Sequence, residues 1–573
     1  MFLAVFIVRA HGSVPGFSGF TLFDDAMISM SYGRTLVRSG EWVWFPGAAR
    51  VQGFTNPLWT LYMALLHALG LEGSKAALAV SVTSAILVLA CAFLVGYLVR
   101  SALDGTKFAD WTAFAAAGTV PFLYPLVFWS LRGMEVGFLA LLSLGMVTSV
   151  AELIRRWGMG RTPTPALLAL GATASLGILT RLDFVLPAAV VGLLALTWAP
   201  DGRARTGLAL IAGVPMVVAT AALLLFQRLY FGDWLPNTYR LKMGGTSVSE
   251  RLLRGIAASG KVLPITLVLV ASVAVVVWSA ADPLTKRIVI LLSSVWASVF
   301  AYSLWVGGDA WEWSRMANRY LAVALPSVVA VVFIAIAQLL QTHLRLRPGG
   351  IVLLVLVTAS GIAYGAKTNP YAFNPRDAAV VTLGLLVTIA ACAVATRRAT
   401  HGSESSGAAL AALTSAFLVI MVSVSALPAL LWLKDAGPHV HDDALMTASG
   451  IEMRAATDPD AVIATAWAGA PGYYSERPMV DLLGKSDRRI ARSAPRRVPG
   501  SNLESFFPGH DKWDLEYSVG KLRPDILFQM YDTVSANKLA NWGYVPRCLS
   551  DGTVVYVLRT STRVDMRRLP ECS

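Results

Sequence analysis

The sequence predicts an all-α polytopic membrane protein of about thirteen transmembrane helices, followed by a small C-terminal α/β domain. Of its 573 residues, 55% are hydrophobic and only 14% are charged, with a mean hydropathy of +0.59. A single water-soluble core cannot bury that much apolar surface. Long apolar runs continue to Leu433, after which the composition becomes polar. We therefore expect a multi-spanning domain over residues 1–433 and a soluble domain over residues 434–573.

The apolar runs can cross a hydrocarbon layer of ~30 Å as helices, and backbone groups in lipid require helices where no barrel pattern is present. The expected spans are 76–99, 111–131, 134–152, 165–181, 183–199, 207–230, 262–278, 287–306, 320–341, 350–366, 378–396 and 409–432. The N-terminal run MFLAVFIVRA is too short, and we interpret it as a truncated first helix. Residues 57–70 are also too short to span, and their aromatic side chains and His67 favour a helix lying in the membrane interface.

The basic residues predict the orientation of these spans. If residues 10–74 are exported, alternation places basic loops on the opposite side, in agreement with the positive-inside rule. Those loops hold Arg100, Lys107, Arg155, Arg156, Arg161, Arg203, Arg205, Lys286, Arg287, Arg345, Arg347, Arg397 and Arg398. The net charge of +13 therefore needs no nucleic-acid partner. We expect a multi-pass protein of the plasma membrane whose C-terminal domain is extracytoplasmic.

The polar tail after Leu433 contains short apolar runs typical of strands. AVIATAW, PMVDLLG, PDILFQM and TVVYVLR are bounded by polar residues, which favours a small α/β fold. Cys548 and Cys572 also lie in the tail and can form a disulfide if the tail is exported. The glycines of GGDAW lack the spacing of a phosphate-binding loop.

Two adjacent carboxylates, Asp24 and Asp25, are the clearest candidates for chemistry. They open the amphipathic segment FDDAMISMSYGRTLVRSG at the predicted exit of the first helix. Carboxylates beside apolar surface are costly unless they are paired, hydrated or used. An ordinary helix cap is the alternative, although a cap explains one aspartate better than two. The pattern favours a general base that takes a proton from a sugar hydroxyl, and either aspartate can fill that role.

Further charged clusters lie at other predicted exported ends. They occur in SLRGMEVG, LTRLDFVLP, FGDWLPNTYRLKMGG and VGGDAWEWSRMANRY, and they contain Arg132, Glu135, Arg181, Asp183, Asn237, Tyr239, Lys242, Asp309, Arg315 and Arg319. Taken singly, each charge is as well explained by snorkelling or by pairing at a helix end. All of them nevertheless fall on one predicted face of the membrane. Arginines and a lysine gathered there suit a lipid-linked phosphate.

The order of these motifs resembles a known family. FDDAMISMSYGRTL followed by WFPGAARVQGFTNPLWT resembles the first exported loop of the GT-C glycosyltransferases. The later motifs, together with MVDLLGKSDRRIAR and FPGHDKW in the tail, are similar to a bacterial branch that includes the terminal arabinofuranosyltransferase of mycobacterial cell walls. The resemblance covers nearly the whole chain.

The resemblance implies a GT-C-like fold and an inverting transfer of a sugar, arabinofuranose in that branch, from a polyprenyl-phosphate donor to a glycan or lipid acceptor of the cell envelope. It places the base at Asp24, with Asp25 as neighbour or substitute. Arg34, Glu135 and Arg181 would orient sugar or phosphate, and His510 would reach over the site from the tail. Where the branch has a proline and a glutamate after the arginine, this chain has Leu182 and Asp183.

Two other classes of function also fit a multi-spanning chain with phosphate-binding arginines. One is a transporter or flippase of lipid-linked sugars, although such proteins tend to carry repeats and ionisable residues at the bilayer midplane. The other is a GT-C-like assembly subunit without catalysis. No set of His and Cys residues has metal-ligand spacing, and no cofactor is required. A divalent cation held by Asp24, Asp25 and the phosphate is compatible with the sequence.

Overall fold

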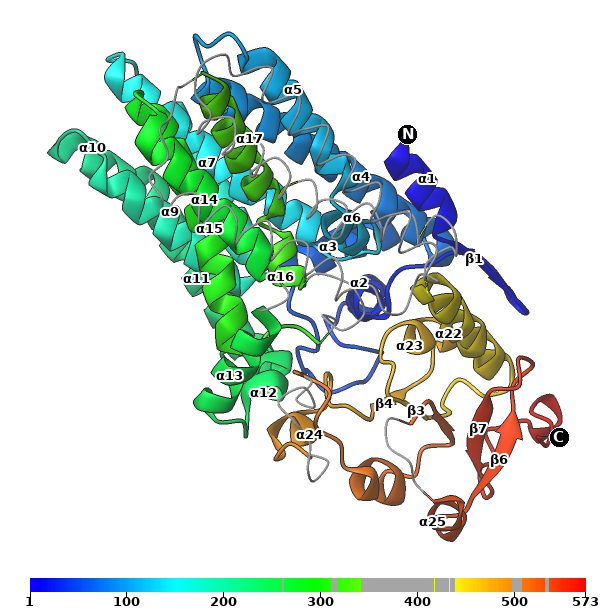
Figure 1. The fold of residues 1–573 in the computed structure, drawn as a ribbon. Coiled ribbons are helices and arrows are strands. Elements are labelled where there is room, and N and C mark those ends of the chain that lie inside the picture. Colours follow the sequence, from blue (N-terminus) through cyan, green and yellow to red (C-terminus); the bar gives the residue numbers. More distant parts are fainter. Residues whose placement is uncertain are drawn as a thin grey trace.

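Helices form most of the computed structural model, and a small sheet lies near the C-terminus (Figure 1). The model describes residues 1–259, 262–310, 318–341, 417, 432, 438–496, 508–530 and 535–572. The spans predicted at 350–366 and 378–396, nearly all of 409–432, and Arg315 lie outside these residues.

Four helices are long and apolar enough to cross a membrane: Gly73–Ala102, Val136–Gly158, Gly202–Phe231 and Pro283–Val306. Two further pairs of helices qualify if each bent pair counts as one span, which makes up to six within the described residues. In one pair, Ala109–Phe122 and Tyr124–Leu131 meet at 51°, where Pro121 and Pro125 interrupt the helical hydrogen bonds. A total of about thirteen spans remains a prediction.

The bundle and the segments that precede it are built from helices with one short hairpin. In chain order the elements are α1 (Phe2–Arg9), β1 (His11–Val14), β2 (Phe17–Phe20), α2 (Asp24–Ser39), α3 (Pro57–Ala68), α4 (Gly73–Ala102), α5 (Ala109–Thr119), η1 (Val120–Phe122), α6 (Tyr124–Leu131), α7 (Val136–Gly158), α8 (Thr164–Thr180), η2 (Leu182–Phe184) and α9 (Val185–Thr197). They continue with α10 (Gly202–Gly207), η3 (Leu208–Gly213), α11 (Val214–Phe226), η4 (Gln227–Phe231), α12 (Asn237–Met243), α13 (Val248–Ser259), α14 (Leu263–Ser279), α15 (Pro283–Val306), α16 (Arg319–Ala322) and α17 (Leu325–Gln341).

The ends of the long helices group as the charge pattern predicts. Arg155 donates to the carbonyl of Ser101 (3.1 Å), and the Thr285 hydroxyl donates to the carbonyl of Ala102 (2.6 Å). The C-terminal ends of α4 and α7 and the N-terminal end of α15, which are expected on the basic side, therefore lie together. Which of the two ends faces the cytoplasm stays a prediction.

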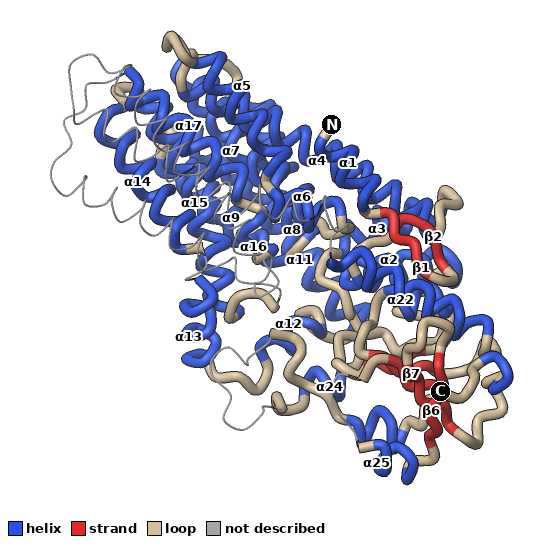
Figure 2. Tube along the Cα trace, turned by 45° about the vertical axis from the view of Figure 1, so that its right-hand side comes forward, coloured by secondary structure: helices blue, strands red, loops and turns tan. Residues whose placement is uncertain are grey.

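Helix α2 lies between the bundle and the C-terminal sheet (Figures 1 and 2). Most of its residues are buried, because α3 packs on one side and the tail on the other. The close approach to α3 needs a glycine: a Cβ on Gly33 would lie 2.9 Å from the backbone nitrogen of Ala64. The twelve-residue α3 covers residues 57–68, and its location in the membrane interface stays a prediction.

The tail contains a five-stranded sheet in the order β4-β3-β5-β7-β6, in which β3 pairs in parallel with β4 and β5. All four predicted strands are present, and Tyr544–Cys548 adds a fifth. The predicted disulfide between Cys548 and Cys572 is also present. The tail elements are α22 (Pro438–Ala455), β3 (Ile463–Thr465), α23 (Ala470–Ser475), β4 (Met479–Asp481), α24 (Arg488–Arg492), η8 (Glu516–Lys521), β5 (Ile526–Phe528), α25 (Ala536–Asn541), β6 (Tyr544–Cys548), β7 (Val554–Leu558) and η9 (Met566–Arg568). Residues 434–573 as a separate exported domain stay a prediction.

A buried ion pair joins this tail to the bundle. The guanidinium of Arg132, which follows α6, contacts the carboxylate of Asp443 in α22, and both side chains are almost fully buried. Arg132 also donates to the carbonyl of Thr21 (2.7 Å), so three separate parts of the chain meet at one charge. Such a pair is not by itself stabilising, but removal of one partner leaves a buried charge without compensation.

We therefore expect Asp443→Asn to lower the free energy of unfolding by about 3–5 kcal/mol, measured by denaturant titration in detergent. Asp442→Asn is the matched control, because the neighbouring Asp442 is exposed. The apolar double variant Arg132→Met/Asp443→Leu should recover most of the loss. Equal stability of Asp443→Asn and the control would contradict this account of the junction.

Candidate active site

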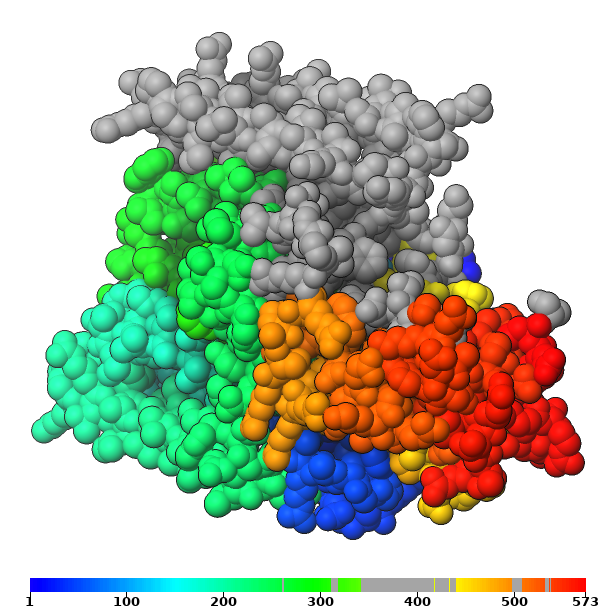
Figure 3. All heavy atoms as spheres, turned by 90° about the horizontal axis from the view of Figure 1, so that it is seen from below, coloured from blue at the N-terminus to red at the C-terminus, as the bar shows by residue number. Residues whose placement is uncertain are grey.

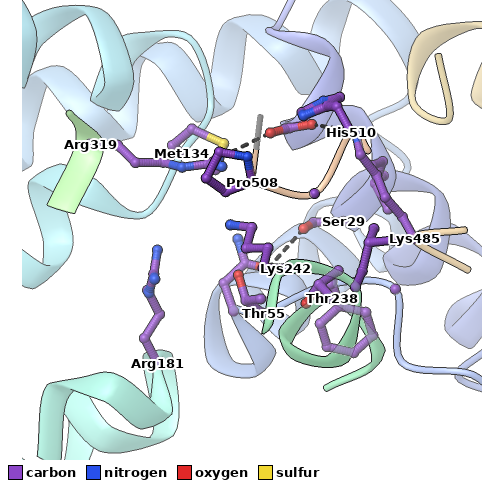
Figure 4. A pocket seen from close by; sticks show the side chains of 17 residues that line it. Ser29, Thr55, Met134, Arg181, Thr238, Lys242, Arg319, Lys485, Pro508 and His510 are labelled. Atoms are coloured by element: carbon purple, nitrogen blue, oxygen red, sulfur yellow. Dashed lines mark hydrogen bonds and ion pairs between the residues drawn. The ribbon is translucent and has the colours of Figure 1, made fainter. Parts of the chain in front are cut away.

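A small polar cavity of about 60 Å³ lies where the bundle, α2 and the tail meet. Its lining comes from eight segments of the chain and comprises Asp25, Ile28, Ser29, Gly53, Phe54, Thr55, Asn56, Met134, Arg181, Thr238, Leu241, Lys242, Arg319, Lys485, Pro508, Gly509 and His510. In Figure 4, Arg181 and Arg319 approach from one side, Lys485 and His510 from the other, and Lys242 lies between them. Seen from below, N-terminal (blue), central (green) and tail (orange) residues adjoin on one face (Figure 3).

Asp25 is the carboxylate that lines this cavity. Its Oδ1 lies 2.8 Å from Nζ of Lys485, and its Oδ2 lies 3.0 Å from a terminal nitrogen of Arg319. Burial alone would raise the pKa of Asp25, but the charges of Lys485 and Arg319 outweigh it and hold the pKa well below its usual range. Asp25 is therefore ionised at every pH near neutrality.

Asp24 has a different environment, although it is the next residue along the chain. It is absent from the cavity lining, and its Oδ1 accepts hydrogen bonds from the backbone amides of Gly469 (3.1 Å) and Ala470 (2.8 Å) at the start of α23. Burial raises the pKa of Asp24 to about 6, against the lowering effect of Lys485 and of these amides. The residue that the resemblance favours as the base thus holds the tail against α2.

Lys485 was not among the site residues predicted from the sequence. It lies in a loop after β4 that several hydrogen bonds hold in place. The carboxylate of Asp481 accepts hydrogen bonds from the amides of Leu483, Gly484 and Ser486. The side-chain nitrogen of Asn237 lies 2.9–3.2 Å from three carbonyls of the same loop. Two signals could have found it: Lys485 lies in the motif MVDLLGKSDRRIAR, and it follows a predicted strand, where ligand sites of open α/β sheets are found.

Arg181 reaches the opposite wall of the cavity from between α8 and η2. It forms a bidentate pair with Asp183 (2.9 Å for both bonds) and a third bond with Glu135 (2.9 Å). The other oxygen of Glu135 accepts from Asn56 (2.8 Å), which in turn accepts from Ser29 in α2. Glu135 and Asp183 therefore orient the guanidinium and do not line the small cavity themselves.

Arg319 and Lys242 complete the set of cations. Arg319 lies between Asp25 and Asp309, with its Nε 3.2 Å from an Asp309 carboxylate oxygen. Lys242 donates to the hydroxyl of Tyr320 (3.0 Å), and none of its contacts within the described residues is with a carboxylate. A lysine placed in this way can bind an anion without first giving up an ion pair.

A second, larger cavity of about 470 Å³ adjoins the first, and the two share Thr55, Arg181, Thr238 and Lys242. Most of its remaining lining is apolar and comes from α9, α12, α15 and nearby loops: Leu182, Val185, Leu186, Leu235, Pro236, Met243, Ala301, Trp305 and Val306, together with Asp183, Tyr239, Tyr302 and Tyr320. Cavities of this size bind small ligands in many proteins. The pair of cavities therefore offers a cationic end and an apolar groove.

The other predicted site residues divide between the cavities and the tail contacts. His510 lines the small cavity, and burial and the charge of Lys485 lower its pKa to about 4, so the ring is neutral near pH 7. Tyr239 lines the large cavity. Arg34 was expected at the sugar or phosphate, but it is absent from both linings and instead pairs with Glu476 (3.4 Å) above the ring of Tyr473.

The acidic residues of the site do not form a set of ligands for a divalent cation within the part of the chain that the structure describes. Among the described residues, no group of three or more His, Cys, Asp and Glu side chains has the spacing of a metal site. Asp24 and Asp25 do not converge, because Asp24 contacts backbone amides and both oxygens of Asp25 contact cationic side chains.

Comparison with solved structures identifies the architecture. ArnT from Cupriavidus metallidurans bound to undecaprenyl phosphate matches with a TM-score of 0.51 and 14% identity, over 98% of this chain and 97% of that chain. The apo state of the same protein matches with a TM-score of 0.50 and 15% identity, over 97% and 96%. This chain shares the overall fold of ArnT.

The remaining comparisons do not bear on this assignment. The archaeal oligosaccharyltransferase AglB from Archaeoglobus fulgidus matches with a TM-score of 0.42 and 13% identity, over 98% of this chain and 74% of that chain. Residues 439–564 of the tail match the model of a domain of unknown function, DUF8728. No curated protein matches the chain. At 14–15% identity the similarity to ArnT shows a shared fold, and a fold does not by itself determine function.

The contacts of Asn237 predict a testable coupling between α12 and the Lys485 loop. Asn237→Ala removes the side-chain donor from three loop carbonyls, so we expect the loop to lose about 1–3 kcal/mol of local stability. Hydrogen exchange of the amides of Leu483, Gly484 and Ser486 should accelerate. Asn541→Ala, at an exposed position, should leave them unchanged. Unaltered protection in Asn237→Ala would show that Asp481 alone holds the loop.

Proposed function

We propose that this protein is an inverting glycosyltransferase that uses a polyprenyl-phosphate sugar. One observation carries the proposal: a polar cavity with an ionised carboxylate shares two cationic residues, Arg181 and Lys242, with a larger apolar cavity. A polyprenyl-phosphate sugar consists of an apolar chain, a phosphate and a sugar. These match, in order, the apolar cavity, the two shared cations and the polar cavity. The polyprenyl chain would occupy the large cavity, and the phosphate would lie at Lys242 and Arg181.

The reaction is a single displacement at the anomeric carbon. The acceptor hydroxyl attacks that carbon, its proton passes to Asp25, and the bond to phosphate breaks with the electron pair remaining on the phosphate oxygen. Cations that are already oriented stabilise the charge that develops on the phosphate. Asp25 suits the role of base by position, because it lines the cavity. The pKa of Asp24 lies closer to neutrality, but two backbone amides hold its carboxylate.

The finer assignments rest on the sequence motifs. We propose a pentofuranosyl donor, with arabinofuranose as the first candidate, and a glycan or lipid acceptor of the cell envelope. The protein would lie in the plasma membrane with the cavity and the tail on the exported side. The departure at Leu182 and Asp183 falls beside the large cavity, so donor selectivity is the property to examine first.

Replacement of the proposed base should abolish transfer without unfolding the protein. We expect Asp25→Asn to reduce kcat by about 10²- to 10⁴-fold, measured as sugar transfer in proteoliposomes supplied with polyprenyl-phosphate pentoses and hexoses. Asp24→Asn is the matched control, because an amide oxygen can still accept from Gly469 and Ala470. The larger loss in Asp24→Asn would make Asp24 the base. Full activity of both variants would refute the proposal.

Lys242 should hold the phosphate. Loss of a hydrogen bond to a charged group costs about 1.5–3 kcal/mol, so Lys242→Met should weaken binding of undecaprenyl phosphate by about tenfold to a hundredfold. Binding of uncharged undecaprenol should not change. Arg240→Met removes one positive charge from the same helix, but Arg240 is half exposed and pairs with Asp233, so it serves as the control. Equal affinities in both variants would place the phosphate elsewhere.

A further inference from the structure

Lys485 belongs to the tail, yet its charge lies inside the cavity. The ammonium is 2.8 Å from Asp25, and the side chain is only 12% exposed. Burial of an ammonium group costs free energy unless an opposite charge pairs with it. Asp481 from within the tail and Asn237 from α12 both fix the loop that carries Lys485, so the ammonium is held at the carboxylate.

We propose that Lys485 is a cation of the catalytic centre, shared between Asp25 and the phosphate that leaves the donor. The inference rests on the proposed function. During transfer Asp25 gains the proton of the acceptor hydroxyl and becomes neutral. The donor phosphate changes from a diester with one negative charge to a monoester, which carries about −1.5 to −2 at pH 7. A negative charge thus disappears at Asp25 and appears on phosphate within one small cavity.

Lys485 is better suited to this exchange than Arg319. Arg319 contacts Asp309 on its far side and lies over the ring of Trp129, so its guanidinium is held in place. Within the described residues, Asp25 is the only carboxylate within ion-pair distance of Lys485. Once that carboxylate is protonated, the flexible stem of the lysine leaves its ammonium able to turn toward the phosphate. The tail therefore completes the catalytic centre and does not merely cover it.

The test compares Lys485→Met, Lys485→Arg and the control Lys521→Met, whose lysine is exposed on the tail. Removal of one preoriented group that stabilises developing charge lowers kcat by about 10²- to 10³-fold, and we expect this loss in Lys485→Met. Lys485→Arg should retain part of the activity, and Lys521→Met all of it. Aminoethylation of Lys485→Cys, which restores a primary amine at that position, should recover activity.

The pH profile separates a chemical role from a structural one. Three groups act on Asp25 from facing elements: Lys485 from the tail, Arg319 from α16 and His510 from its loop. The adjacent Asp24 points to the tail amides but also interacts with Asp25 through its charge. Loss of Lys485 removes the largest charge that lowers the pKa of Asp25, so this pKa should rise in Lys485→Met, and the rate of the variant relative to wild type should fall toward acidic pH. Lys485 also lowers the pKa of Asp24 and of His510, so the changed pH profile reports the loss of its charge from the site as a whole.

The outcomes distinguish this inference from the proposed function. If wild type transfers sugar and Asp25→Asn does not, a fully active Lys485→Met with an unchanged pH profile overturns the inference. Loss of activity with a lowered Tm and no recovery on aminoethylation would also overturn it, because the role would then be structural. If wild type transfers no sugar, or if Asp25→Asn and Asp24→Asn are both fully active, the proposed function itself has failed.

Discussion

Asp25 is held between two cations, Arg319 from the bundle and Lys485 from the tail, and the contacts around them keep both in place. Arg319 is oriented by Asp309 behind it, and Lys485 is carried by a loop that Asp481 and Asn237 fix. A buried carboxylate is unfavourable unless such partners reach it. The site therefore forms only when the tail packs against the bundle in one particular orientation.

Helix α2 is where these constraints meet. Asp24 at its start caps α23, Arg34 farther along pairs with Glu476, and the hydroxyl of Tyr32 lies 3.2 Å from that of Ser486. These contacts hold the tail against one side of the helix while Asp25 faces the cavity. Two adjacent aspartates have separate roles because neighbouring residues on a helix point about 100° apart.

The helical class, the strands and the candidate clusters could be predicted from the sequence, because hydrophobic period and helix-end charge are local properties. The directions in which individual side chains point could not be predicted from the sequence. Arg34 and Asn237 were assigned to substrate, yet both contact the tail. Lys485 was missed because its position depends on tertiary structure. The parallel pairing of β3 with β4 and β5 sets where the loop after β4 lies, and no local pattern in the sequence gives that pairing. The pattern of charges located the face of the bundle, and the tertiary fold decided which side chains reach the cavity.

The most direct test of the account is photocrosslinking with undecaprenyl phosphate that carries a diazirine in its prenyl chain. The account predicts adducts on the apolar wall of the large cavity, at residues such as Leu186, Met243 and Trp305, that excess undecaprenyl phosphate suppresses. Adducts confined to the outer surface of the bundle, for example at the exposed Phe114, and insensitive to competitor would contradict it.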